Sequence, residues 1–88
     1  MTAKEMFLNL ENVKEYRESK YWIEIYEKEK DEPYIIFDKN TELIIFNAHL
    51  FDEEQKIYNS CIELEELKAI NKQVEELGWN NEWWTKIL

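Results

Sequence analysis

Glycine and proline are almost absent from this chain, which contains one of each among its 88 residues. A loop that cradles phosphates needs several glycines, because its backbone N–H groups must come close to the ligand. The usual nucleotide-binding loops are therefore excluded. Long apolar runs are also missing: no stretch reaches the about 18 residues of a membrane helix, and no basic start precedes an apolar segment. We expect neither a membrane span nor a signal peptide.

Cysteine and histidine, which build many metal and redox sites, occur once each. Cys61 has no partner for an intrachain disulfide, which fits a reducing cytoplasm, and we expect it to be a small buried hydrophobe. His49 has no second His or Cys at ligand spacing, so we expect it on the surface or in a loop. Asp52, Glu53 and Glu54 lack the alternating ligands and the glycine of a calcium loop. We expect no metal site and no cofactor.

Signals for catalysis are equally scarce. Ser19 and Ser60 lack the glycine-flanked turn that exposes a nucleophilic serine. Twenty acidic residues guarantee some close carboxylate pairs. Nothing in the sequence, however, places a pair in the apolar pocket that would shift its pKa usefully. We therefore expect no catalytic residues, and an enzyme is only the third hypothesis.

Basic residues are outnumbered, with 11 Lys and Arg against 20 Asp and Glu, for a net charge of −9. A chain with this charge repels phosphate, so direct binding to nucleic acid is not expected. Two explanations of the acidity remain open. It provides solubility, or it attracts a protein partner with a basic surface.

Large side chains are what the sequence has in abundance: four Trp, five Tyr and four Phe. In a chain of this length they predict one domain, residues 1–88, around one core. Thr2 followed by Glu5 is a capping box, and apolar residues at helical spacing predict a helix over 3–10. Continuation of this helix through Val13 and Tyr16 is left open.

Strand signals dominate the middle of the chain. Apolar and polar residues alternate from Tyr21 to Tyr26, and two β-branched runs are separated by the turn formers at 38–41. Residues 50–55 are expected to form a loop. We expect strands over residues 21–26, 34–37, 43–46 and 56–62.

The last third predicts an amphipathic helix over 64–77, because its apolar residues recur at helical spacing. Gly78 suits the left-handed position that ends a helix, and Trp79 can fold back on the last turn. Asn80 or Asn81 can cap one more turn. The predicted fold class is α+β: an N-terminal helix, a four-stranded antiparallel meander, a C-terminal amphipathic helix packed on one sheet face, and an aromatic tail.

Aromatic residues are also the best candidates for partner contacts. Trp22 and Tyr26 share one face of their strand, opposite its isoleucines, so both faces carry apolar bulk. Trp83 and Trp84 make the C-terminus unusually aromatic. Trp and Tyr are enriched at interface hot spots. Two alternatives stay open: the tail packs back over the open sheet face, or these rings meet a second copy of the chain.

Acidic residues cluster in two places and complete the candidate contact surface. If the strand over 56–62 brings the two clusters together, they form one anionic surface that mimics phosphate spacing in a basic groove. The alternative is that the first cluster forms a solvated turn and the second lies at the start of a helix, where carboxylates are favoured. The residues are Asp52, Glu53, Glu54, Glu63, Glu65 and Glu66.

Two terminal segments together make up about a quarter of the chain: residues 2–7 (TAKEMF) with Leu10, and residues 65–79 (EELKAINKQVEELGW). They resemble the two ends of small proteins encoded in prophages of low-GC Gram-positive bacteria. Two departures are Glu11-Asn12, where the family often has Gly-Tyr, and the tail 80–88, which extends beyond the family's usual end. The resemblance implies a phage accessory role and no catalytic residues.

These observations favour a cytoplasmic, phage-derived protein that inhibits a bacterial protein by steric occlusion. The resemblance adds host defence as the target, with anti-CRISPR activity or mimicry of nucleic acid as forms of it. The alternative is a homo-oligomeric accessory protein, such as a homodimer, with no inhibitory role.

Overall fold

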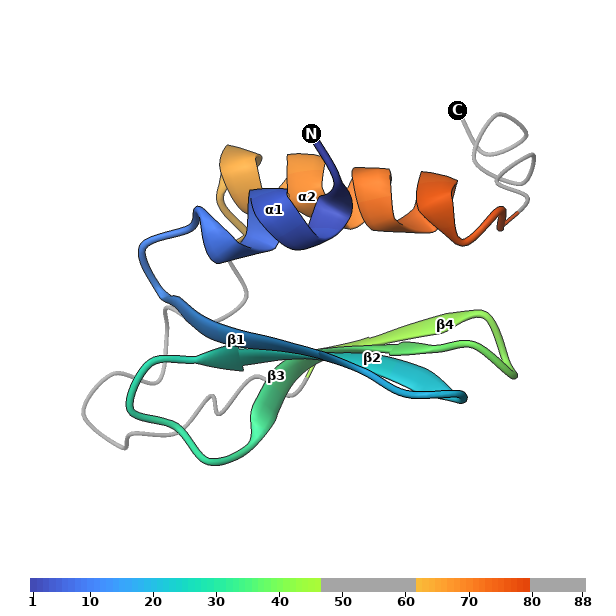
Figure 1. Ribbon diagram of the computed structural model, residues 1–88, viewed down its shortest axis with the longest axis horizontal. Coiled ribbons are helices and arrows are strands. Elements are labelled where there is room, and N and C mark those ends of the chain that lie inside the picture. Colours follow the sequence, from blue (N-terminus) through green and yellow to red (C-terminus); the bar gives the residue numbers. More distant parts are fainter. Residues whose placement is uncertain (47–61, 80–88) are drawn as a thin grey trace.

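The computed structural model describes residues 1–46 and 62–79, which form two layers (Figure 1). One layer is a four-stranded antiparallel sheet in the order β1-β2-β3-β4, and both helices lie over one of its faces. This is the predicted α+β class with its antiparallel meander. Along the chain the elements are α1 (Ala3–Leu8), β1 (Val13–Glu18), β2 (Trp22–Glu27), β3 (Pro33–Asp38), β4 (Leu43–Phe46) and α2 (Leu64–Glu76).

Helix α1 begins with the predicted capping box. The Thr2 hydroxyl accepts a hydrogen bond from the Glu5 N–H at 3.1 Å, and the Glu5 carboxylate accepts one from the Thr2 N–H at 2.8 Å. The helix ends at Leu8, and its continuation through Val13 and Tyr16 is wrong, because both residues lie in β1. Valine and tyrosine fit a pleated, half-buried surface better than a helix, and here they also reach the core.

Three of the expected strands are confirmed as β2, β3 and β4, within one residue at each end. The remaining strand of the sheet is β1, which pairs with β2 through Tyr16 opposite Ile25. The strand expected over 56–62 falls outside the described residues apart from Ile62, which is not in a strand. In the β3–β4 turn, the Asp38 carboxylate accepts hydrogen bonds from the N–H groups of Asn40 and Thr41, as its turn-forming type predicts.

The core lies between the sheet and the helices and follows the alternation of β2 and β3. Ile23 and Ile25 on β2, and Ile35 and Phe37 on β3, point toward the helices and are buried. From the helical layer, buried Phe7, Ala69 and Ile70 meet them. Since neighbouring residues on a strand point to opposite faces, Trp22 and Glu24 of β2 and Ile36 of β3 point away from the helices.

Helix α2 ends in the left-handed turn that its only glycine predicts. Gly78 has φ +70°, its N–H donates to the Glu75 carbonyl, and the Trp79 N–H donates to the Val74 carbonyl at 3.3 Å. This pair of hydrogen bonds is the Schellman motif. It turns Trp79 back toward the sheet, where the centroid of its ring lies 6.3 Å from that of Phe37. The predicted cap is confirmed, and the Trp79 ring packs on Phe37 of the sheet.

Candidate protein-binding surface

The sheet face opposite the helices carries a group of partly exposed apolar side chains. Pairing between strands places Trp22 beside Asp38 and Asp38 beside Leu43, with Glu24, Ile36 and Ile45 in the next row. Trp22 is 44% exposed and Leu43 56% exposed, where a single chain normally buries such residues if it can. We call Trp22, Ile36, Leu43 and Ile45 the outer patch.

Carboxylates border the outer patch. Asp38 lies within it, and Glu24 lies between Ile36 and the β1 residue Arg17. The Arg17 guanidinium forms an ion pair with Glu15, which holds the pKa of the Glu15 carboxyl below its usual value. The charge of this arginine is therefore already balanced by Glu15. The surroundings of the patch are left acidic, in keeping with the net charge of the chain.

Of the two aromatic residues predicted for this face, only Trp22 is accessible. Tyr26 is 7% exposed, because the Arg17 guanidinium lies over its ring at 4.7 Å from the centroid. Its hydroxyl accepts a hydrogen bond from Arg17 and donates one to Glu24, both at 3.4 Å. We correct the expectation that Tyr26 stands beside Trp22 as an exposed contact residue: its ring is already covered within the chain.

The predicted acidic residues of α2 lie in the helical layer, away from the outer patch. Glu66 accepts hydrogen bonds from the Glu63 N–H at 3.2 Å and from the Tyr34 hydroxyl at 3.1 Å, and Glu65 pairs with Lys68. Burial, with a further contribution from the charge of Glu66, raises the pKa of Tyr34. Glu63 and Glu66 therefore have structural roles at the helix start, and they do not share a face with Trp22.

The other predicted contacts, Asp52, Glu53, Glu54, Trp83 and Trp84, lie outside the described residues. Their role stays a prediction. So does the single anionic surface that was expected to join the two acidic clusters.

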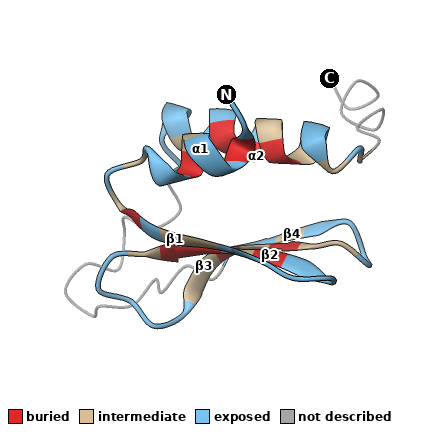
Figure 2. Ribbon diagram, viewed as in Figure 1, coloured by how far each residue is buried: buried red, intermediate tan, exposed pale blue. Residues whose placement is uncertain are grey.

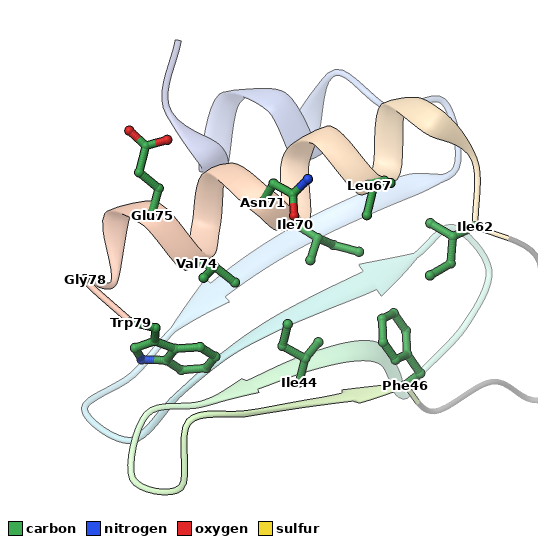
Figure 3. Close-up of a pocket in the computed structure, with 10 residues that line it drawn as sticks. All are labelled: Ile44, Phe46, Ile62, Leu67, Ile70, Asn71, Val74, Glu75, Gly78 and Trp79. Carbon is green, nitrogen blue, oxygen red and sulfur yellow. The ribbon is translucent and has the colours of Figure 1, made fainter. Parts of the chain in front are cut away.

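An apolar groove of about 590 Å³ lies between α2 and β4, on the helix side of the sheet (Figure 3). Ile44 and Phe46 of β4 face Leu67, Val74 and other residues of the α2 side across it. Sequence reasoning missed this groove. The available signal was β4 itself: Leu-Ile-Ile-Phe has no polar residue on either face, which is typical of a fully buried strand. Yet β4 borders the described sheet, and most of it is exposed (Figure 2).

Polar chemistry in the groove is sparse, since among its described lining residues Asn71 and Glu75 are the only ones with polar side chains apart from the Trp79 indole. Within residues 1–46 and 62–79, no three His, Cys, Asp or Glu side chains come together in a metal-binding group. In the same ranges, neither helix has the length and apolarity to cross a bilayer. No family model, curated protein or solved structure matches the chain.

Proposed function

We propose that this chain is a small acidic binding protein that attaches to a bacterial protein with a basic surface and blocks it sterically. The observation that carries the proposal is the outer patch, an apolar surface that includes the exposed Trp22 and has the carboxylates of Asp38 and Glu24 beside its apolar side chains. Exposed apolar patches with polar neighbours are typical of interaction sites. Trp is among the residue types most enriched at the hot spots of such sites.

Charge gives the proposed partner its chemistry. A net charge of −9 steers the chain toward cationic surfaces and away from nucleic acid and other acidic molecules. The carboxylates beside the patch would then meet lysine or arginine side chains at the rim, while Trp22 is desolvated at the centre. Such a contact forms quickly at low ionic strength and weakens as salt screens the charges.

The resemblance of both chain ends to prophage-encoded proteins supports a target in the bacterial host. A defence protein with a basic groove for nucleic acid, such as a CRISPR effector, is the target that an acidic occluding protein fits best. In that case the chain would work in the cytoplasm, where its lone cysteine stays reduced. Asp52, Glu53, Glu54, Trp83 and Trp84 remain predicted contributors to the same contact.

Trp22→Ala is expected to weaken partner binding at least tenfold, because a hot-spot Trp commonly contributes 2 kcal/mol or more, roughly 30-fold. The tagged chain is used to capture proteins from a Gram-positive host lysate, and the affinity of the captured basic protein is then measured by titration. Leu64→Ala is the matched control, because Leu64 is exposed on the α2 side of the molecule. We expect this control to bind like the parent chain, and about 0.5 M salt to weaken binding by both.

Three outcomes would contradict the proposal. The chain captures only itself at every salt concentration, Trp22→Ala binds as tightly as Leu64→Ala, or the captured protein is acidic. A second candidate function, a self-associating accessory protein, is favoured by a different feature, the apolar border strand β4.

A further inference from the structure

The two border strands of the described sheet differ sharply in how they are protected. β1 carries Lys14, Glu15, Arg17 and Glu18, and its pairing with β2 is interrupted by an irregularity between Val13 and Glu15. Charged side chains and bulges are the devices by which proteins keep border strands from pairing with other chains. β4 has no charged residue, and its pairing with β3 is regular.

β4 is also apolar on both of its faces. Leu43 and Ile45 belong to the outer patch, and Ile44 and Phe46 line the groove under α2. Leu43, Ile45 and Phe46 are exposed. Among residues 1–46 and 62–79 no strand pairs with the outer side of β4, so in this part of the chain the strand offers a row of backbone N–H and C=O groups with apolar side chains above and below it.

We propose that β4 pairs antiparallel with β4 of a second copy of this chain, which joins the two sheets into one of eight strands. A two-fold axis perpendicular to the sheet produces this pairing and keeps the helices of both copies on the same face. In an antiparallel pair, directly opposite residues lie on the same face of the sheet. The two-fold axis therefore passes midway between one residue of β4 and the same residue of the second copy. With the axis at Ile45, this residue meets its own copy, and Ile44 of each chain faces Phe46 of the other.

A second copy fits this strand because β4 is complementary to itself. β4 contains no charged residue, so this register brings no two charges of β4 together. Wherever both opposite residues belong to β4, an apolar side chain meets an apolar side chain. Phe46 and Ile44 bring apolar surface to the open side of the groove in both copies. The four side chains of β4 are already partly covered within the chain, so they supply less than the roughly 800 Å² per partner of a standard interface. The dimer is therefore weak and sensitive to concentration.

Dimerisation also changes the surface described above. Because the axis is perpendicular to the sheet, the outer patches of both copies face the same direction. They meet where the two β4 strands pair. Trp22 is then presented twice on one broad face. The inference does not depend on the proposed function, because β4 pairing requires no foreign partner.

Sedimentation velocity over a dilution series tests the pairing. The parent chain is expected to pass from monomer to dimer with rising micromolar concentration. Higher salt should strengthen this dimer, because it screens the repulsion between two chains of charge −9. Binding to a basic partner has the opposite salt dependence, so failure of the dimer and failure of the proposed function are distinguishable.

Ile45→Lys places two like charges opposite each other at the axis, and we expect it to remain monomeric up to at least tenfold higher concentration. Leu8→Lys is the matched control, since Leu8 is exposed on α1, and it should dimerise like the parent chain. If circular dichroism shows that Ile45→Lys is unfolded, Phe46→Lys takes its place, because it sets a charge against the apolar Ile44 of the second copy. A parent chain that is monomeric at every concentration overturns the proposal, as does a folded Ile45→Lys or Phe46→Lys that dimerises normally.

Discussion

Replacing Phe37 with alanine is expected to lower the free energy of unfolding by about 3–5 kcal/mol. Phe37 is 0% exposed near the end of β3, and its ring contacts Phe7 edge-on at 6.0 Å between centroids. Trp79 packs on the same ring, so Phe37 connects the sheet with both α1 and the end of α2. Because small domains are stable by only about 5–15 kcal/mol, this variant loses a large part of its stability. Urea denaturation followed by tryptophan fluorescence measures the change.

Leu8→Ala is the control for this experiment. Leu8 is exposed on α1, and alanine is a strong helix former, so its free energy of unfolding should stay within about 0.5 kcal/mol of the parent value. If Phe37→Ala were to unfold at the same urea concentration as Leu8→Ala, the packing described for the core would be wrong.

Tyr16→Phe is expected to cost about 1–3 kcal/mol, although it removes a single oxygen atom. The Tyr16 hydroxyl donates a hydrogen bond of 2.7 Å to the side-chain carbonyl of Gln73, which is 2% exposed on α2. Burial raises the pKa of Tyr16 to about 12, so the hydroxyl keeps its proton and donates throughout the neutral range. Without this donor the Gln73 carbonyl is buried and unpaired, which penalises the folded state. Urea denaturation measures the loss.

The double variant Tyr16→Phe/Gln73→Leu separates this cause from loss of packing. Removing both polar partners leaves no unpaired group, so the double variant should recover most of the stability that Tyr16→Phe loses. A double variant that is less stable than Tyr16→Phe would show that the hydrogen bond is not the reason for the loss.

Sequence patterns predicted those elements whose local signals agree with their place in the fold. The capping box at Thr2 and Glu5 marks α1, and Gly78 ends α2 where a left-handed residue is required. Alternation identified β2, because Ile23 and Ile25 enter the core while Trp22 and Glu24, before and between them, do not. In each case the local preference and the tertiary contact favour the same conformation.

β1 was missed because its local signals conflict with its environment. Val13 and Tyr16 are three residues apart, a spacing that also suits a helix continuing from Phe7. The charged residues between and after them hide the alternation of a border strand. Pairing with β2 and the contact of Tyr16 with Gln73 decide the conformation, and both depend on residues distant in the sequence.

The candidate surface was predicted only in part, for a similar reason. Trp22 and Tyr26 have the same strand phase, but Arg17 of the neighbouring strand covers Tyr26 and leaves Trp22 open. The alternation of residues along one strand cannot show that a side chain of the neighbouring strand covers one of them. Likewise, the composition of β4 indicates a buried strand, and only its place in the strand order shows that it is a border.

Amide hydrogen exchange in β4, followed by NMR at two protein concentrations, tests most directly whether another polypeptide joins the sheet at this strand. Alternate N–H groups of β4 point away from β3, and they should exchange slowly in concentrated protein and rapidly after dilution. The corresponding groups of β1 should exchange rapidly at both concentrations, because its charges and irregular pairing oppose addition of a strand. If the outward amides of β4 exchange at one rate regardless of concentration, whether fast or slow, no second chain occupies that border.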